Sequence, residues 1–376
     1  MRDVRTIGYR PTWAEINLSN LEYNFRQMRG MVRPQTKVMV TVKADAYGHG
    51  LIPVSQRLVA CGVDYLGVAS IDEGLRLRSA RIRVPILILG MILDGDIEPL
   101  FRYNLTPTVC TRELAAVLSR KAVALKKPLK VHIKVDTGMG RLGVLHDDAL
   151  TLIKKIYALP GIAIEGLFTH LAFADLNESF TLHQIDLFNK LLVQLEQNKI
   201  MIPLVHSANS MGVLRFKRSH FTMVRPGLVV YGLRPALDTS FPLRLKPVLS
   251  LKTRIVYYKR MPQGSGISYG HAYVTKDNTT IAILPIGYGD GYPRILSNKA
   301  SVLIQGRRFP ISGRICMDQI MVDVGNTSVR RGEEVVLIGS QGKETVSAEE
   351  LAHLSDTIPY EIVCGLGSRI PRVYIT

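Results

Sequence analysis

Residues 38–50 read VMVTVKADAYGHG, and this stretch decides how the rest of the chain is interpreted. Residues 38–42 are apolar or β-branched, and a short run of this kind predicts a buried strand of a parallel sheet. Lys43 stands at the carboxyl end of that strand. An ammonium group is costly to desolvate, and burial or a cationic neighbour lowers its pKa, which suits an amine that forms a Schiff base. A lone lysine after a strand is more often a solvated loop residue, so other features must decide.

Apolar runs of the same kind recur further along the chain and alternate with amphipathic segments. The runs lie at residues 38–42, 64–70, 85–90, 105–110, 130–135, 164–171, 203–208 and 221–227. Helical patterns such as TRELAAVLSRKAVALKK and TLHQIDLFNKLLVQLEQNK stand between them. This alternation predicts a (β/α)8 barrel, an α/β fold. Because some of the helices are short, an open doubly wound sheet is the alternative.

The two ends of the chain lack the alternating strand and helix patterns of the predicted barrel. TWAEINLSN, residues 12–20, predicts a strand and then a helix over about 21–31, capped by Ser19 with Glu22 in a capping box. PALDTSFPLRLKP predicts a linker, and segments such as TTIAILPIGYG and EEVVLIG predict a second, mainly antiparallel β domain. We expect domains at residues 1–241 and 242–376. The strand at about 11–17 is expected to pair with the second domain, whose sheet edge would give it a partner.

Composition narrows the class of protein. The chain has 376 residues, of which 47% are hydrophobic, enough for a sizeable core. The net charge is +17, but the basic residues are dispersed, which favours a basic enzyme surface over a nucleic-acid site. The four cysteines form no C-x-x-C pair, so no metal site is expected, and their spacing fits a reducing compartment. Because no signal peptide or membrane span is visible, we expect a cytoplasmic protein without a membrane partner.

Polar residues gather where the predicted barrel strands end, which is where barrel enzymes carry their functional side chains. Any one of them is as well explained as a cap or a loop residue. Their number at one rim favours an active site. They are Lys43, Lys134, Asp136, Arg141, His170, His206, Asn209, Ser210, Arg225 and Gly227.

A reactive lysine at this rim has two interpretations, a Schiff-base lysine of an aldolase and a lysine that holds pyridoxal phosphate (PLP). PLP requires a phosphate cradle, a partner for the pyridine nitrogen and a group near the ring hydroxyl. Asn209 and Ser210, and Gly227 with Leu228, follow the last two strands, where barrels bind phosphate. Arg225 could face the ring nitrogen. Because arginine stays protonated, the ring would remain a weak electron sink, which suits brief deprotonation and reprotonation at one carbon.

Seven segments resemble, in order, the motifs of the alanine racemases, a PLP-dependent family of fold type III. They are VKADAYGHG, DTGMGRLG, HSANS, MVRPGLVVYG, SYG, IGYGDGYPR and GRICMDQ, and the resemblance spans about residues 13–360. It implies PLP-dependent racemisation of L- and D-alanine, which supplies D-alanine for peptidoglycan. It also implies a homodimer with shared active sites.

The same resemblance implies a role for each matched residue. Lys43 would attach PLP and act as the base facing D-alanine, and Tyr269 of the partner subunit would face L-alanine. Arg225, supported by His206, would contact the pyridine nitrogen, and His170 would lie beside the cofactor and help to set the state of Tyr269. The phosphate ligands implied are Tyr47, Ser210, Gly227, Leu228 and Tyr360.

The substrate side is assigned in the same way. Arg141 would contact the ring hydroxyl and the substrate carboxylate side. Cys316, Met317 and Asp318, from the second domain of the partner, would line the substrate pocket, and Tyr288 would stand at its entrance. Lys134 matches a lysine that some members carry as a carbamate, which sequence cannot reveal.

Elementary chemistry agrees with two bases, because racemisation needs one on each face of Cα. A tyrosine, with an ordinary pKa of about 10, needs nearby positive charge to act as a base at neutral pH, and the arginines and the histidine could supply it. One alternative is a racemase of another or broader amino acid range, such as serine. Others are a decarboxylase on the same barrel, which would lack a base like Tyr269, and a PLP-binding homeostasis protein, which would be a single barrel.

Overall fold

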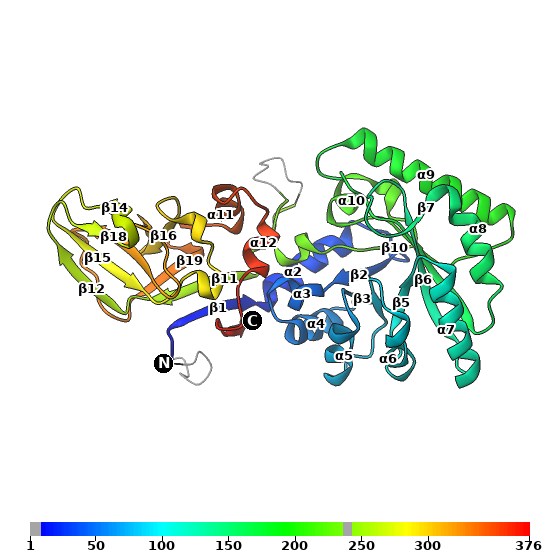
Figure 1. Ribbon diagram of the computed structural model, residues 1–376. Helices are drawn as coiled ribbons and strands as arrows, with labels where there is room; N and C mark the ends of the chain where they lie inside the picture. Colours follow the sequence, from blue (N-terminus) through cyan, green and yellow to red (C-terminus); the bar gives the residue numbers. More distant parts are fainter. Residues whose placement is uncertain (1–8, 236–242) are drawn as a thin grey trace. The chain divides into compact units, whose positions relative to one another are not determined.

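The computed structural model describes residues 9–235 and 243–376, and its colours follow the chain in Figure 1. The described chain falls into two compact units. One holds residues 22–46 and 51–230; the other holds the described residues up to 21, residues 47–50, and the described residues from 231 onward. The predicted boundary between residues 241 and 242, and most of the predicted linker, lie outside the described residues.

The first unit is the predicted parallel barrel. Its strands pair in the order β10-β2-β3-β4-β5-β6-β8-β9, and β7 (Val144–Leu145) adds to β6. The strands are β2 (Lys37–Thr41), β3 (Tyr65–Val68), β4 (Ile86–Ile88), β5 (Thr106–Val109), β6 (Leu129–Asp136), β8 (Ile162–Phe168), β9 (Leu204–His206) and β10 (Met223–Val224).

Closure of this sheet excludes the open, doubly wound alternative. β10 pairs with β2 through Met223 and Lys37, so the last strand returns to the first. The remaining seam is joined by single hydrogen bonds, from Thr222 N to the Val205 carbonyl at 3.1 Å and from Arg225 N to the Ala208 carbonyl at 2.8 Å. The barrel is therefore nearly closed, and the carboxyl ends of its strands meet at one rim.

Helices connect the strands, and the two helical patterns quoted from the sequence are confirmed as helices over residues 112–125 and 178–197. The helices are α4 (Leu51–Ala60), α5 (Ile71–Ser79), α6 (Glu98–Arg102), α7 (Arg112–Leu125), α8 (His146–Tyr157), α9 (Glu178–Gln197) and the short α10 (Ser210–Arg215). Side-chain caps at Ser70, Thr111 and Asn177 accept from backbone N–H groups and explain where α5, α7 and α9 begin.

The predicted start of the first helix is wrong. Helix α2 runs over Leu18–Gly30, and Asn17, the last residue of β1 (Thr12–Asn17), accepts the Asn20 N–H at 2.9 Å. Asn17 is therefore the cap in place of Ser19. The strand turns straight into the helix, which leaves no room for the extra linking residues that a cap at Ser19 requires.

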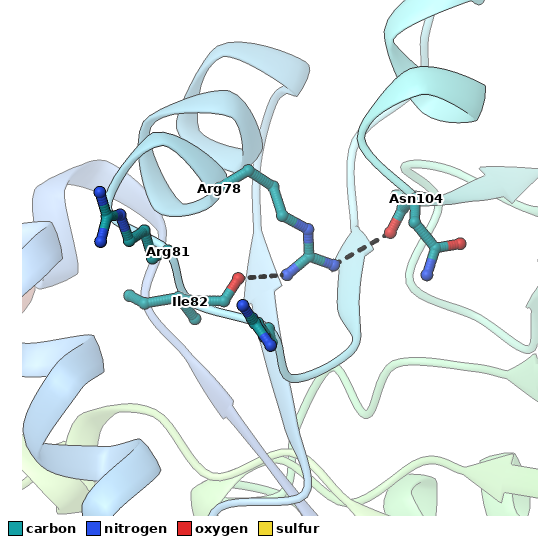
Figure 2. A pocket seen from close by; sticks show the side chains of 5 residues that line it. Arg78, Arg81, Ile82 and Asn104 are labelled. Carbon is teal, nitrogen blue, oxygen red and sulfur yellow. Dashed lines mark hydrogen bonds between the residues drawn. The ribbon is translucent and has the colours of Figure 1, made fainter.

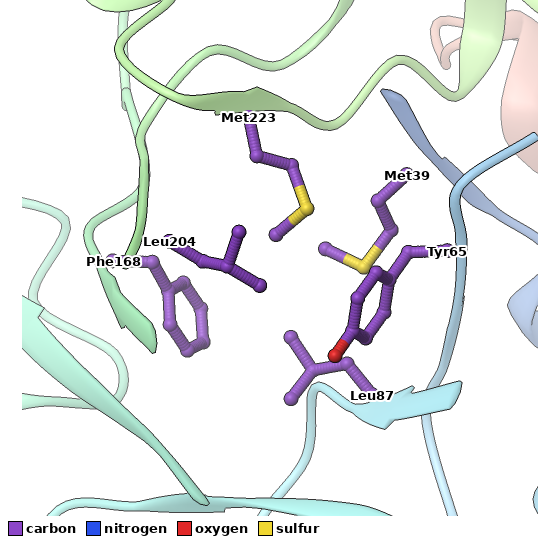
Figure 3. Packing of buried hydrophobic residues seen from close by; sticks show 6 residues of the cluster. All are labelled: Met39, Tyr65, Leu87, Phe168, Leu204 and Met223. Atoms are coloured by element: carbon purple, nitrogen blue, oxygen red, sulfur yellow. The ribbon is translucent and has the colours of Figure 1, made fainter. Parts of the chain in front are cut away.

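The barrel interior is filled by large apolar side chains that are at most 6% exposed. Met39, Tyr65, Leu87, Phe168, Leu204 and Met223 point toward one another from six strands (Figure 3). Burial of each such side chain contributes on the order of 1.5–3 kcal/mol. The interior is thus a packed core, and ligand chemistry is left to the rim.

The second unit is mainly antiparallel. One sheet has the order β17-β16-β19-β11-β1-β21, with β20 on β19; a second has β12-β15-β18; a third is the pair β13-β14. Strand β1 pairs antiparallel with β11 and parallel with β21, with Ala14 opposite both Leu251 and Arg372. The remaining strands are β11 (Leu249–Arg254), β12 (Tyr257–Met261), β13 (Gly266–Ile267), β14 (Tyr273–Val274), β15 (Thr279–Leu284), β16 (Ser301–Ile304), β17 (Arg307–Pro310), β18 (Ile320–Gly325), β19 (Glu334–Gln341), β20 (Glu344–Val346) and β21 (Arg372–Ile375).

Two short helices, α11 (Ala348–Leu354) and α12 (Pro359–Cys364), complete this unit. Within residues 9–235 and 243–376, no helix combines the length and the apolar character needed to span a membrane.

At the amino-terminal ends of β4 and β5, Arg78 ties two loops together beside a surface pocket (Figure 2). Its guanidinium donates to the carbonyls of Ile82 at 2.7 Å, Val84 at 2.8 Å, Tyr103 at 2.9 Å and Asn104 at 3.0 Å. A single cation therefore satisfies four backbone acceptors that no strand pairing reaches. This end of a barrel serves stability, since the chemistry belongs to the opposite rim.

Replacing Arg78 tests that role. Arg78→Met keeps the aliphatic stem and leaves the carbonyls without their donor, so we expect the free energy of unfolding of the barrel to fall by about 2–3 kcal/mol. Urea denaturation with hydrogen exchange on β4 and β5 measures the change. Arg83→Met, an exposed neighbour, is the matched control and should stay within about 0.5 kcal/mol of the wild type. Equal losses in both variants would contradict the role assigned to Arg78.

Candidate active site

Lys43 begins a backbone turn of rare conformation. The next four residues all have positive φ angles: Ala44 at 53°, Asp45 at 52°, Ala46 at 55° and Tyr47 at 54°. They form one turn of left-handed helix, the element α3 (Lys43–Tyr47). L-residues pay about 1–2 kcal/mol each for this conformation. Backbone strain of this kind persists only where the surroundings hold it, and it gathers at functional sites.

Two carboxylates hold the turn in place. Glu73, on α5, accepts the N–H groups of Ala44 and Ala69, each at 2.7 Å. Asp45 accepts the Leu51 N–H at 3.1 Å and pairs with Arg76 at 3.1 Å. Gly48 follows with φ of 77°, and a Cβ there would lie 2.2 Å from the Val363 carbonyl oxygen. The strained turn therefore fixes the point at which Lys43 leaves the first barrel strand.

The strain can be measured by removing a methyl group. Ala44 is exposed, and Ala44→Gly relieves its left-handed conformation, so we expect the free energy of unfolding to stay level or rise by up to about 1 kcal/mol. Ala124→Gly, at an exposed position of the right-handed helix α7, is the matched control and should cost about 0.5–1 kcal/mol. Thermal denaturation compares the two. A similar loss in both variants would mean that the turn is unstrained.

Asp136 organises the loop that carries Arg141. Its carboxylate accepts three successive N–H groups, from Gly138 and Met139 at 2.8 Å each and from Gly140 at 2.9 Å. Burial opposes ionisation, but these N–H groups lower the pKa of Asp136 below its ordinary value. The loop after β6 is thus folded around one carboxylate.

Gln184 joins that loop to the loop after β8. Its amide nitrogen donates to Thr137 Oγ1 at 3.2 Å and to the His170 carbonyl at 3.1 Å, and its oxygen accepts the Ala172 N–H at 2.9 Å. Gln184 is buried although it belongs to helix α9. The loops that bear Arg141 and His170 therefore have a common anchor.

Arg225 is the buried cation of the barrel rim, with only 5% of its surface exposed. It donates to the Thr169 carbonyl at 2.7 Å, the Ser207 carbonyl at 3.1 Å and His206 Nδ1 at 2.8 Å. Burial lowers the pKa of Arg225 to about 9, so the group remains charged at neutral pH. The ring of Phe168 lies 5.2 Å from the guanidinium carbon and stacks on His206.

Electrostatics shows that the predicted rim residues converge. Burial and the positive charges of Arg225, Arg141, Lys134 and Lys43 together lower the pKa of His170 well below its ordinary value. Burial, Arg141 and Arg225 likewise lower the pKa of Lys134 to about 8. Four cations thus act on one neutral imidazole, and they come from the ends of three strands, β2, β6 and β10. Such a field stabilises negative charge that develops near it.

The buried histidines predict a pH dependence. His132, His170 and His206 all have pKa values lowered mainly by burial. The unfolded chain takes up a proton on each near pH 6.5, but the native barrel does not. The free energy of unfolding should therefore fall as pH decreases below 6.5, by up to about 1.4 kcal/mol per pH unit for each group.

Urea denaturation between pH 7 and 5 measures this slope. His170→Asn should reduce it by about one proton, and His183→Asn, on an exposed position of α9, controls for the loss of a histidine as such. A stability that is flat from pH 7 to 5 would contradict the neutral, desolvated state of these rings.

Polar groups after β9 and β10 meet at another part of the rim. Ser210 Oγ accepts the Gly227 N–H at 3.0 Å, and Asn209 caps α10 by accepting the Gly212 N–H at 2.9 Å. Leu228 begins a 3-10 turn, η3 (Leu228–Tyr231). Two loops with backbone N–H groups at helix starts are therefore tied together, an arrangement that suits an anionic group.

In the second unit, the other predicted site residues lie on adjoining loops. Tyr288 and Gly289 donate backbone N–H groups to the carbonyls of Cys316 and Met317, at 3.0 and 2.9 Å. Ser268, whose hydroxyl lies 3.7 Å from Cys316 Sγ, immediately precedes Tyr269. The side chains of Tyr269, Tyr288 and Met317 are 68%, 42% and 53% exposed. Large apolar groups so exposed on one chain favour a contact with another molecule.

A fully buried carboxylate, Asp290, supports these loops. It pairs with Arg10 at 2.7 Å and with Arg369 at 3.4 Å, and it accepts the Gly287 N–H at 2.9 Å. Arg369 also binds Asp318 at 2.7 Å. In the same unit, the ring of Tyr47 packs on those of Tyr231 and Tyr360, at 4.8 and 5.7 Å.

Sequence reasoning missed several residues that hold this site. Glu73, Gln184 and Asp290 stand in ordinary helical or loop patterns, and only their contacts single them out. Asp290 lies inside the motif IGYGDGYPR, which could have directed attention to it. Gln184 gives one weak signal, an amide in the middle of an otherwise apolar helix face.

The fold and the rim are typical of a barrel enzyme, with Lys43 and other cations at the carboxyl ends of the strands. Comparison with known proteins then gives the family. Residues 16–235 match the family described as "Alanine racemase, N-terminal domain", and residues 248–374 match "Alanine racemase, C-terminal domain". The chain therefore belongs to the alanine racemase family and is an isomerase.

Individual relatives agree over nearly the whole chain. An alanine racemase from Halothermothrix orenii is 52% identical over 367 residues, which is 97% of each chain. One from Carboxydothermus hydrogenoformans is 45% identical over 97% of this chain and 100% of its own. The solved alanine racemase of Clostridium difficile 630 superposes with a TM-score of 0.93 at 38% identity, over 98% of this chain and 96% of its own.

Proposed function

We propose that this protein interconverts L-alanine and D-alanine with PLP as cofactor and with two bases, Lys43 and Tyr269 of the partner subunit. The positive charge around His170 carries the proposal, because four cations from the ends of three strands lower the pKa of one imidazole at the rim. Relatives named alanine racemase, which are 42–52% identical, make alanine the substrate to test first.

The residues of the rim fit the proposed cofactor. The Ser210 hydroxyl, the Gly227 and Leu228 N–H groups, and the Asn209-capped turn would hold its phosphate, together with Tyr47 and Tyr360. Arg225 would face the ring nitrogen, and Arg141 the ring hydroxyl and the substrate carboxylate. When bound, PLP supplies an electron-withdrawing ring conjugated to the substrate amine.

Two side chains of the protein would remove and return the proton on the substrate Cα. Lys43 would exchange it on one face of the substrate Cα and Tyr269 of the partner subunit on the other. Arg225 has no proton to lose at neutral pH, so the ring nitrogen would stay unprotonated and negative charge at Cα would be short-lived. The cations that lower the pKa of His170 would also favour the tyrosinate form of a base that docks there.

A shared site requires a homodimer. Tyr269 and Met317 are exposed on the single chain, and a two-fold pair would bury both in equivalent sites. Cys316 and Asp318 would line the substrate pocket beside them, and Tyr288 would stand at its entrance. We further propose a cytoplasmic enzyme that supplies D-alanine for peptidoglycan. Activity on serine or on a broader set of amino acids is the alternative, and a panel of L-amino acids decides between them.

Subunit mixing tests the two bases and the shared site together. Lys43→Ala and Tyr269→Phe homodimers should each be inactive. In a mixed dimer one site collects both substitutions and the other collects neither. Random pairing makes about half of the dimers mixed, so about a quarter of wild-type racemase activity should return.

Tyr257→Phe, on an exposed tyrosine of the same unit, is the matched control and should be fully active. Exchange of subunits is verified by mass spectrometry on one isotopically labelled partner. If exchange is complete and no activity returns, each site is built within a single chain. If the wild-type protein itself neither binds PLP nor racemises alanine, the proposed function is wrong.

A further inference from the structure

A carboxylate below the rim occupies an irregular position in its strand. Along the β6–β8 pairing, Val131 lies opposite Ile164, but His132 lies opposite Gly166, so Glu165 is an extra residue on β8. A bulge of this kind turns a side chain away from the direction that strand alternation gives it. The Glu165 side chain is only 14% exposed.

Three donors surround Glu165. Lys130 Nζ lies 2.6 Å from Oε1, and the Tyr65 hydroxyl donates to Oε2. His132 Nε2 lies 3.6 Å from Oε2, which is too far for a hydrogen bond but close enough for its N–H to be attracted by the carboxylate charge. Burial would raise the pKa of Glu165, but His132, Lys130 and Tyr65 lower it to about 2. The group is therefore an anion under all working conditions.

From Glu165 a chain of contacts leads to the rim. His132 Nδ1 lies 2.9 Å from His206 Nε2, and His206 Nδ1 lies 2.8 Å from Arg225 Nη1. His132 and His206 are fully buried, and Arg225 is nearly so. The chain thus connects the carboxylate at the bulge with the cation that the proposed function assigns to the cofactor ring.

Bonding rules leave one arrangement of protons in this chain. Arginine can only donate, so His206 Nδ1 must accept, and neutral His206 carries its proton on Nε2. That proton can only go to His132 Nδ1, so His132 carries its own proton on Nε2, facing Glu165. The opposite tautomers would place an N–H of His206 against an N–H of Arg225, leaving two buried donors without an acceptor.

The packing leaves room for the rings and little freedom to turn. A Cβ at Gly166 would lie 2.3 Å from His132 Nδ1, so only glycine accommodates the imidazole. Phe168 stacks on His206 with ring centres 4.7 Å apart and planes at 4°. The rings are therefore fixed in place, and the tautomer is the remaining variable.

We propose that Glu165 is a positioning residue: its carboxylate at one end of the contacts and Arg225 at the other favour the same tautomers of His132 and His206, and these hold the Arg225 guanidinium in one orientation. The tautomers of His132 and His206 are inferred from the observed contacts alone and do not depend on the proposed function. Its effect on catalysis rests on the proposed function, because there Arg225 faces the ring nitrogen of PLP.

The test uses the full-length dimer with ¹⁵N-labelled histidine, with and without PLP. In the wild-type protein, long-range ¹H–¹⁵N correlation spectra should show His132 and His206 protonated at Nε2. Glu165→Gln has the same shape but can turn an NH₂ group toward His132, so Nδ1-protonated forms should appear. In the loaded variant, kcat/KM should fall about tenfold, because Arg225 loses a charge-assisted contact, and the PLP absorbance spectrum should shift.

Lys130→Gln is the matched control. It removes an exposed donor from the same carboxylate but keeps the anion, so the tautomers should be unchanged and kcat/KM should stay within about twofold. Should Glu165→Gln not fold, His132→Gln breaks the chain at its next member and should release His206 in the same way.

Wild-type tautomers in folded Glu165→Gln overturn the proposal, whatever the activity. A tautomer change with unaltered kcat/KM and absorbance spectrum overturns the link to Arg225. Failure of the proposed function would appear differently, as a wild-type protein that neither binds PLP nor racemises alanine. The tautomers of the unloaded protein would still decide the role of Glu165.

Discussion

The structure depends most on how one buried cation is satisfied. Arg225 follows the last barrel strand and donates to carbonyls that follow the two preceding strands, at Thr169 and Ser207. An unpaired charge at this depth would cost several kcal/mol, so the barrel must close with these carbonyls in place. The same bonds fix the guanidinium at the rim. The same hydrogen bonds therefore both help to close the barrel and orient a candidate catalytic group.

The strained turn after β2, the strand that pairs with β10, is stabilised in a similar way. The left-handed turn from Ala44 to Tyr47 is unfavourable locally, and Glu73 and Asp45 compensate by binding backbone N–H groups and Arg76. Glu73 lies on α5, the helix after the next strand, so the turn is stabilised only when β3 and α5 have packed beside β2. A lysine that leaves such a turn has little freedom, and orientation of this kind lowers the cost of reaction.

In the second unit a buried carboxylate has the corresponding role. Asp290 binds Arg10 and Arg369, and Arg369 also binds Asp318 in the loop that holds Met317. Asp290 is fully buried, so separating it from its cations would be costly, whereas the exposed Arg369–Asp318 pair contributes little. Both units thus present their candidate site residues from loops that are fixed by buried ions.

The sequence by itself determined the barrel, the β character of the second unit and the position of Lys43, because periodic burial and strand ends are local features of the chain. It also carried the motifs that indicate the family. Only the tertiary structure decided the left-handed turn, the Asn17 cap and the inward turn of Glu165. The turn depends on Glu73, a partner distant in sequence, and Glu165 depends on a one-residue shift in strand register. The cap depends on how far β1 pairs with β21 before the helix begins. A β-bulge changes which face a side chain occupies without changing the apolar pattern, so no reading of that pattern could place Glu165 beside His132.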